Sequence, residues 1–259
     1  MKSNFAAKAF LFCGILFLFF SCKKEENKDE PLAPYKSGVV LIFDDSYVKN
    51  WFEADEVLRK YSWKGTFCVS NLNTLPLAEI NKLLVLQNEG HEIAGHSLHH
   101  SNAMQFVAQY GIKQYLSQEV NPMLALMDFY GLKVISFAYP YGARSPEIDA
   151  YLLRQFQIIR GRDFGGQIPS KQDCYYNHSR IVFGFDIDNN HTYFSASYLL
   201  KLLEYAHKNN KILILCSHKT VNEATANYQT EIKLLEFICD YMKKHHMKFY
   251  TLSELYDLK

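Results

Sequence analysis

Five residues of this sequence could form a catalytic site, because each stands just behind an apolar run with the composition of a β-strand. They are Asp44, Asp45, His96, His100 and His218. One carboxylate and two imidazoles make a three-ligand set for zinc or a similar divalent ion, with positions left open for water and substrate. The remaining carboxylate and imidazole are suited to accept and donate a proton. The pattern therefore indicates a metal site that carries an acid and a base.

The spacing of these residues adds detail. Asp44 and Asp45 are adjacent, so at a strand end their side chains point in roughly opposite directions, and one can bind a metal while the other stays free as a base. An Asp at such a position is also commonly a helix N-cap. His96 and His100 are four residues apart, which places both imidazoles on the same side of a turn or helix. His99 could replace His100 in a register of three, so spacing alone leaves the second histidine ligand open.

Segments typical of strands and helices alternate from Gly38 onward, which predicts an α/β fold with a parallel sheet and helices outside it. In a barrel of this kind the carboxyl ends of the strands converge on one face, where the candidate residues would meet. An open doubly wound sheet gives the same alternation but concentrates its site at a single crevice. Because the candidate residues follow several different strands, we expect a (β/α) barrel.

The expected strands are 38–43, 64–69, 91–95, 134–138, a short one at Ile158, 182–187, 211–216 and 248–250. The expected helices are 48–61, 76–88, 111–130 with a bend near Pro122, one that begins at Pro146, 195–209 and 230–245.

The amino-terminal residues do not read as part of this fold. The run Phe10–Phe20 is almost entirely apolar, and it is about half the roughly 20 residues that cross a bilayer, so we expect residues 1–21 to be a signal peptide. The charged segment that follows predicts a flexible tether over 22–37. The boundary resembles a bacterial lipoprotein signal, in which Cys22 is lipidated. This predicts an exported lipoprotein on the periplasmic or cell-surface face of the outer membrane; an ordinary signal or a short membrane anchor is the alternative.

Composition narrows the functional class of the remaining stretch, 38–259, which we expect to be one catalytic domain. The formal net charge is +1 at pH 7 and no basic stripe is present, which argues against a nucleic-acid partner. Four cysteines would remain in the mature fold, and they form no CxxC pair, so we assign them no role. They are Cys68, Cys174, Cys216 and Cys239.

Several segments, in order along the chain, resemble the polysaccharide deacetylase family (carbohydrate esterase family 4, the NodB homology domain). They are Ile42-Phe43-Asp44-Asp45-Ser46, Lys64-Gly65-Thr66-Phe67, Gly90 to His100, Phe137-Ala138-Tyr139-Pro140-Tyr141-Gly142 and Leu215-Cys216-Ser217-His218. The resemblance implies a distorted (β/α) barrel of about seven strands. It also implies a metal-dependent hydrolase that removes acetyl groups from a glycan.

The resemblance also implies a role for each matching residue. Asp45, His96 and His100 would hold a divalent metal, most often zinc and sometimes cobalt or another ion. Asp44 would be the general base and His218 the general acid. The backbone N–H of Tyr141, next to Pro140, would stabilise the oxyanion, and Leu215 would wall the acetyl pocket.

Two expected partners are missing from the matching positions. Where the family often has an arginine that orients the base, this chain has Ala138. Arg144, Arg162 or Arg180 could supply the guanidinium from elsewhere, although a surface or helix-end role is favoured for each of them individually. No motif supplies an aspartate that tunes the acid histidine. Asp186 and Asp188 are the candidates for that role, and either could instead cap a turn.

The expected substrate is therefore an N-acetylated glycan outside the cytoplasm, such as an N-acetylglucosamine polymer or peptidoglycan. O-acetylated xylan is an alternative, because the same attack cleaves esters. A glycan-binding lipoprotein with weak or no catalysis on the same fold is the alternative from another class, and a non-sugar amidase is a third possibility.

Overall fold

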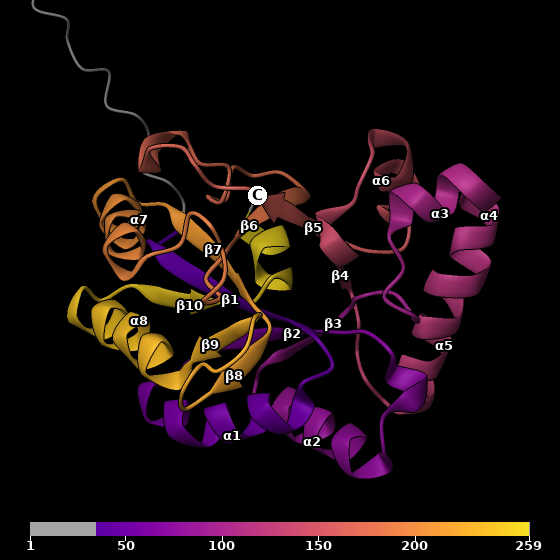
Figure 1. Cartoon of the computed structure of the whole chain (residues 1–259), viewed down its shortest axis with the longest axis horizontal. Coiled ribbons are helices and arrows are strands. Elements are labelled where there is room, and N and C mark those ends of the chain that lie inside the picture. The colour runs from indigo at the N-terminus through magenta and orange to yellow at the C-terminus, as the bar shows by residue number, and fades with distance from the viewer. Residues whose placement is uncertain (1–34, 259) are drawn as a thin grey trace, which may run out of the picture. The chain divides into compact units, whose positions relative to one another are not determined.

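The computed structural model describes residues 35–258, and its centre is a closed barrel of seven parallel strands (Figure 1). Each strand pairs with the next along the chain, and β1 also pairs with β7, which closes the barrel. The barrel strands are β1 Gly38–Asp45, β2 Gly65–Val69, β3 Glu92–Gly95, β4 Ser136–Ala138, β5 Ile158–Asp163, β6 Ile181–Asp186 and β7 Ile212–Ser217. The expected barrel is confirmed.

Helices surround the barrel, and two short additions complete the fold (Figure 1). The helices are α1 Val48–Leu58, α2 Leu77–Asn88, α3 Ala103–Tyr110, α4 Ile112–Tyr115, α5 Asn121–Phe129, α6 Pro146–Leu152, α7 Ala196–Lys208 and α8 Ile232–Lys244. Strand β10 Lys248–Tyr250 pairs with the first half of β1, and β8 Lys219–Val221 pairs with β9 Gln229–Glu231 in a separate sheet.

Side chains along each strand alternate between the two faces of the sheet, so the core has two layers: one between the barrel and the helices and one inside the barrel. In β1, Val39, Leu41 and Phe43 pack with the helices, while Val40 and Ile42 lie with the residues that fill the barrel. Since side chains alternate across a strand, the next inward position after 40 and 42 is 44. The strand pattern therefore directs the Asp44 carboxylate toward the barrel mouth.

One expected helix is divided in the structure, and three observed elements were not expected. The helix expected over 111–130 is divided into α4, a π-helical turn at Leu116–Val120 and α5. The π turn ends two residues before Pro122, whose ring cannot accept a regular helical turn on its amino-terminal side. Helix α3 was not predicted; it begins at an Asn102 cap whose side chain accepts a hydrogen bond from Gln105 N at 3.1 Å. Strands β8 and β9, of three residues each, were also not predicted.

Contacts with the folded domain begin before Gly38, within the last residues of the expected tether over 22–37. Tyr35 and Ser37 are buried, and the Ser37 carbonyl accepts a hydrogen bond from Lys248 N at 3.0 Å. The expected signal peptide, Cys22 and most of the tether lie outside the described residues. Within residues 35–258, no helix combines the length and apolar character needed to cross a membrane.

Candidate active site

The five candidate residues meet in one pocket at the carboxyl ends of the barrel strands. They are Asp44, Asp45, His96, His100 and His218. They come from the ends of β1 and β7 and from the loop after β3. Tyr141, from the loop after β4, lines the same pocket. The convergence expected of a parallel barrel is therefore observed.

Asp45, His96 and His100 form a cluster that fits a divalent metal. Their ligand atoms lie within 4.8 Å of one another. Asp45 Oδ1 is 3.0 Å from His100 Nε2 and 3.7 Å from His96 Nε2. This buried oxygen nevertheless has no hydrogen-bond partner of suitable geometry. A carboxylate oxygen and two ring nitrogens that converge without bonding to one another are the donor set expected around an ion such as zinc.

The protonation of His96 also suits a ligand. Its Nδ1 lies 2.8 Å from the Ala138 carbonyl oxygen, and because a carbonyl can only accept, the ring carries its proton on Nδ1. Nε2 therefore offers a lone pair toward Asp45, in the arrangement that orients metal-bound histidines. Burial lowers the pKa of His96 to about 4, against the opposing effect of Asp44, so the ring is neutral near pH 7.

His99 is excluded from this cluster. Its Nδ1 lies 3.0 Å from Glu119 Oε1, and its backbone N–H donates to Glu119 Oε2 at 2.9 Å. His100, at φ 57°, turns the chain so that its own ring faces Asp45 instead. The choice between His99 and His100 that spacing left open is thereby decided for His100.

A second group, Asp55, Glu89 and His91, also has metal-like composition but is a structural network. His91 Nδ1 accepts a hydrogen bond from Gly65 N at 3.0 Å, and its Nε2 lies 3.1 Å from Asp55 Oδ1. Both ring nitrogens are occupied, so His91 has no lone pair free for an ion. Asp55 Oδ1 also accepts from Trp63 Nε1 at 2.9 Å.

Asp44 forms a buried ion pair with Arg160, a residue that sequence reasoning missed. Arg160 Nη2 lies 2.5 Å from each oxygen of the Asp44 carboxylate, and both side chains are almost fully buried. Burial raises the pKa of Asp44, but the Arg160 guanidinium, with His96 and His218, outweighs it and lowers the pKa to about 2. The carboxylate is therefore ionised and fixed in orientation.

The three arginines considered from the sequence have other partners, so none of them orients Asp44. Arg144 pairs with Asp149, and Arg162 Nη2 lies 3.3 Å from Asp186 Oδ2. Arg180 donates to three backbone carbonyls at distances from 2.7 to 2.8 Å and does not line the pocket. Its guanidinium binds the chain around α6 and β5, which is a structural role.

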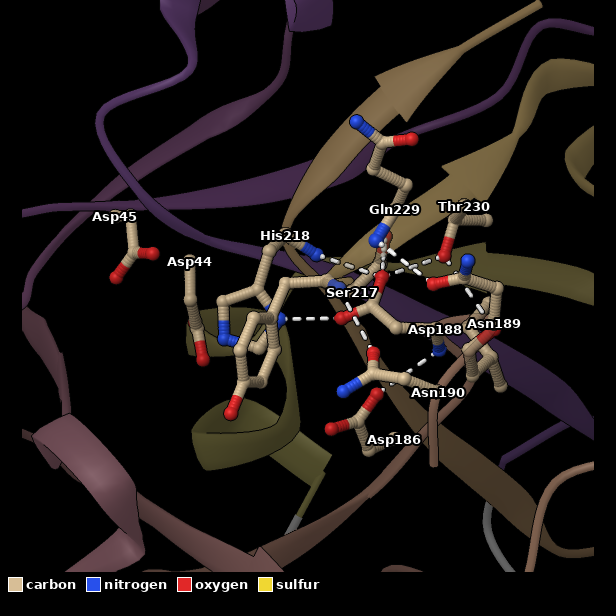
Figure 2. Close-up of polar contacts among 12 residues, drawn as sticks. Asp44, Asp45, Asp186, Asp188, Asn189, Asn190, Ser217, His218, Gln229 and Thr230 are labelled. Carbon is tan, nitrogen blue, oxygen red and sulfur yellow. Dashed lines mark hydrogen bonds and ion pairs between the residues drawn. The ribbon is translucent and has the colours of Figure 1, made fainter. Parts of the chain in front are cut away.

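Asp188, one of the two expected candidates, is the partner of His218. Asp188 Oδ2 lies 2.5 Å from His218 Nδ1, and its Oδ1 accepts from Thr230 Oγ1 at 2.8 Å. Figure 2 shows the His218 imidazole between Asp188 and Asp44. Asp186 contacts Arg162 and accepts from Asp188 N at 2.9 Å, so it supports the loop rather than the imidazole.

The pairing controls the charge on His218. Burial lowers the pKa of the imidazole, but the hydrogen bond to Asp188 and the charge of Asp44 outweigh it and raise the pKa to about 9. The ring is therefore protonated near pH 7. With Nδ1 bonded to Asp188, Nε2 is the nitrogen from which a proton can be donated to a group in the pocket.

Of the three residues expected to contact the substrate, only Tyr141 lines the pocket. Tyr141 has φ 60°, is 61% exposed and places its ring 4.7 Å from that of His100. Pro140 is buried and does not line the pocket. Leu215 lies in the outer core layer, because β7 directs it toward the helices, and the neighbouring Cys216 lines the pocket in its place. The expectation that Leu215 walls the pocket is therefore wrong.

The remaining cysteines carry no site chemistry. Cys68, Cys174, Cys216 and Cys239 are free thiols, and all four are buried. Burial raises the pKa of Cys216, the one that lines the pocket, to about 12. It is therefore a neutral thiol beside the Asp44–Arg160 pair.

Comparison with known proteins identifies one family model and several solved structures that are similar to this chain. The family model described as polysaccharide deacetylase matches residues 33–157. No curated protein matches the sequence.

Solved structures match over most of the chain. The peptidoglycan deacetylase PdaC from Bacillus subtilis has 16% sequence identity and a TM-score of 0.57, over 87% of this chain and 92% of that one. The Xyl-CE4 domain of a multidomain xylanase from the hindgut metagenome of Trinervitermes trinervoides has 19% identity and a TM-score of 0.54, over 86% and 91%. A mutant of BA3943, a CE4 family pseudoenzyme with restored activity, has 19% identity and a TM-score of 0.57, over 87% and 70%. These likenesses concern the fold.

Proposed function

We propose, on the premise that this chain belongs to the polysaccharide deacetylase family, that it is a metal-dependent hydrolase that removes acetyl groups from an N-acetylated glycan. One observation carries the proposal. A cluster fit for a divalent metal, a buried ionised carboxylate and a protonated imidazole share one pocket. These are the parts that hydrolysis of an unactivated amide requires.

Asp45, His96 and His100 would hold the ion, for which zinc is the first candidate and cobalt the second. When bound, such an ion supplies Lewis acidity that polarises the acetyl carbonyl and makes water acidic enough to lose a proton. Asp44 accepts that proton, and its pairing with Arg160 holds the carboxylate toward the pocket. The oxygen–carbon bond then forms at the acetyl carbon.

Breakage of the carbon–nitrogen bond needs a proton, since an amide nitrogen leaves poorly as an anion. His218 donates this proton from Nε2 to the nitrogen of the sugar, while Asp188 stabilises the charged ring. The products are acetate and a glycan with a free amine. The backbone N–H of Tyr141 is proposed to donate to the oxyanion, in the manner of other preorganised donors.

The glycan-binding alternative rested on the two partners missing from the sequence motifs. Arg160 and Asp188 occupy those roles in space, which supports catalysis over binding alone. N-acetylglucosamine polymers and peptidoglycan are the proposed substrates. O-acetylated xylan is the second candidate, because an ester places its carbonyl in the same position.

The location is also a proposal. The apolar run before Cys22 and the charged segment after it support export and lipidation at that cysteine. The catalytic domain would then act at a membrane surface outside the cytoplasm, where acetylated glycans are accessible.

Acetate release from a panel of acetylated glycans tests the activity. The full chain is assayed with zinc or cobalt, with chelator, and as the Asp44→Asn variant. Asp128→Asn, a change at an exposed acid of α5, is the matched control. The proposal requires release that depends on metal, is lost in Asp44→Asn and persists in Asp128→Asn. Absence of release from every substrate with metal bound would favour the binding role.

A further inference from the structure

Tyr228 is an exposed aromatic residue that borders the acid side of the pocket. It stands just before β9, is 51% exposed and lines the same pocket as His218. Its ring centroid lies 5.3 Å from that of the His218 imidazole, at an interplanar angle of 67°. None of the sequence motifs includes this residue.

The backbone holds Tyr228 in a conformation that a tyrosine rarely adopts. Its φ is 59°, in the left-handed region, and such strain persists only where the surroundings enforce it. Asn190 Oδ1 accepts a hydrogen bond from Tyr228 N at 2.7 Å, and the Tyr228 carbonyl accepts one from Lys219 N at 3.2 Å. Outliers of this kind concentrate at functional sites.

A reciprocal amide clamp fixes the rest of the loop. Asn189 N donates to the Gln229 carbonyl at 2.9 Å, and Gln229 N donates to Asn189 Oδ1 at 3.3 Å. Asn189 Nδ2 donates to the Ala226 carbonyl at 2.9 Å. Figure 2 shows Asn189, Asn190 and Gln229 gathered beside Asp188.

The clamp connects directly to the acid. Asn189 and Asn190 follow Asp188 in the chain, and Thr230 Oγ1, two residues after Tyr228, donates to Asp188 Oδ1 at 2.8 Å. The same short segments therefore orient the His218 imidazole and present the Tyr228 ring beside it. The tyrosine and the acid are thus held by the same hydrogen-bonded segments.

The proton transfer from His218 indicates which part of the substrate lies beside the Tyr228 ring. In the proposed reaction His218 gives its proton to the departing amine, so the sugar that carries the amine lies on the side of His218. Tyr141 packs instead against His100, on the side of the metal cluster. The two exposed tyrosines thus face different parts of the substrate: Tyr141 the acetyl group and Tyr228 the sugar.

We propose that Tyr228 is a specificity-determining residue whose ring stacks on the sugar that carries the amine. This inference rests on the proposed function and deepens it, because it assigns recognition of the sugar. An aromatic face presents a flat apolar surface at low conformational cost, which suits the carbon–hydrogen face of a pyranose. Rigid presentation by the clamp lowers the cost of binding further.

Binding in the absence of turnover tests the inference separately from catalysis. Calorimetry measures the Kd of a tetramer of β-1,4-linked N-acetylglucosamine for the full chain in chelator. We expect Tyr228→Ala to raise Kd about tenfold, as truncation of a tyrosine anchor does, and Tyr228→Phe to stay within about twofold because the ring is kept. Tyr110→Ala, at an exposed tyrosine of α3 outside the pocket lining, is the matched control.

Steady-state kinetics provide a second test of the role of Tyr228. With metal bound, the ratio of kcat/KM for the tetramer to kcat/KM for 4-nitrophenyl acetate, which has no sugar, should fall about tenfold in Tyr228→Ala. Asn190→Ala should lower the same ratio, since it removes the acceptor for Tyr228 N. An equal fall on both substrates would mean that the tyrosine only supports His218, and it would overturn the inference.

The outcomes separate the inference from the proposed function. Binding of the tetramer that depends on Tyr228, together with no acetate release from any glycan of the panel when metal is bound, would refute the deacetylase and leave the recognition role standing. A wild-type chain that does not bind the tetramer, or a Tyr228→Ala variant that binds it as well as wild type, would overturn the recognition role.

Discussion

Arg160 of β5 stands directly opposite Ala138 of β4 in the register of the parallel barrel. Ala138 is the position at which the family motif often has an arginine, and Arg160 reaches Asp44 from the neighbouring strand instead. Inward side chains at paired positions of adjacent strands point into the same space. The orienting guanidinium is therefore kept, although its place in the sequence has changed.

Replacement of Arg160 by Met should abolish most activity and destabilise the fold. Removing one partner of a buried ion pair leaves the other charge uncompensated, at a cost of about 3–5 kcal/mol. Acetate release and urea unfolding measure the two effects. Arg154→Met, at an exposed arginine, is the control.

The pairing of Ala138 with Arg160 predicts that a double substitution can restore activity. Arg160→Ala combined with Ala138→Arg should recover at least part of the activity lost in Arg160→Ala, because the guanidinium returns to Asp44 from the opposite strand. A double variant no more active than Arg160→Ala would contradict the equivalence of the two positions.

Asp188→Asn should shift the alkaline limit of activity to lower pH. Burial lowers the pKa of His218, but the hydrogen bond to Asp188 and the charge of Asp44 outweigh it and raise the pKa to about 9, against about 6.5 for a free imidazole. The protonated acid is therefore available up to about pH 9 in the wild type. Without the Asp188 charge, the loss of kcat at alkaline pH should begin at a lower pH than in the wild type. A pH–rate profile with an unchanged alkaline limb would refute this role for Asp188.

The same pair makes stability depend on pH. Since the pKa of His218 is higher in the folded state, its contribution to stability is complete below about pH 6.5 and is lost as pH rises through about 9. The free energy of unfolding of the metal-free chain should fall over this window. In His218→Gln the fall should be smaller, and urea unfolding at several pH values measures the difference.

The amount of bound zinc should depend on His96 and His100 and not on the neighbouring His99. His96→Ala and His100→Ala should each lose bound zinc, whereas His99→Ala should keep it, because His99 is bonded to Glu119. Elemental analysis after dialysis gives the stoichiometry. Zinc should also raise the melting temperature of the wild type, by the stabilisation that any ligand of the native state provides. Loss of zinc only in His99→Ala would reverse the assignment.

Asp55→Asn should destabilise the fold without changing metal content. Burial raises the pKa of Asp55, but its bonds to His91 and Trp63 outweigh this and lower the pKa to about 2. Its contribution to stability is therefore complete above about pH 4 and lost as pH falls through about 2. The melting temperature of the variant should be several degrees lower at pH 7, with one zinc still bound.

The sequence predicted the barrel, and its strand runs, HxxxH spacing and motif order identified the five residues that the fold brings into one pocket. It did not predict Arg160, since an ion pair across 116 positions depends on the register of β4 and β5. Leu215 was misplaced for a related reason. Neighbouring residues of a strand face opposite sides of the sheet, one toward the barrel interior and the next toward the helices. A continuous run of apolar residues does not show which residues face the interior.

The tyrosine beside the acid was missed for a different reason. Strands β8 and β9 have three residues each, too few for a periodic signal. The clamp that holds Tyr228 consists of side-chain amide bonds between segments about 40 residues apart. Only the folded chain brings them together.

Metal-dependent deacetylation is tested by zinc titration of the metal-free full chain, with acetate release from an N-acetylglucosamine oligomer as the readout. We expect no release at first, then a linear rise and a plateau at one ion per chain, with no rise in His100→Ala. Release that is undiminished in chelator, or a chain that binds one zinc and releases no acetate from any acetylated glycan, would contradict it.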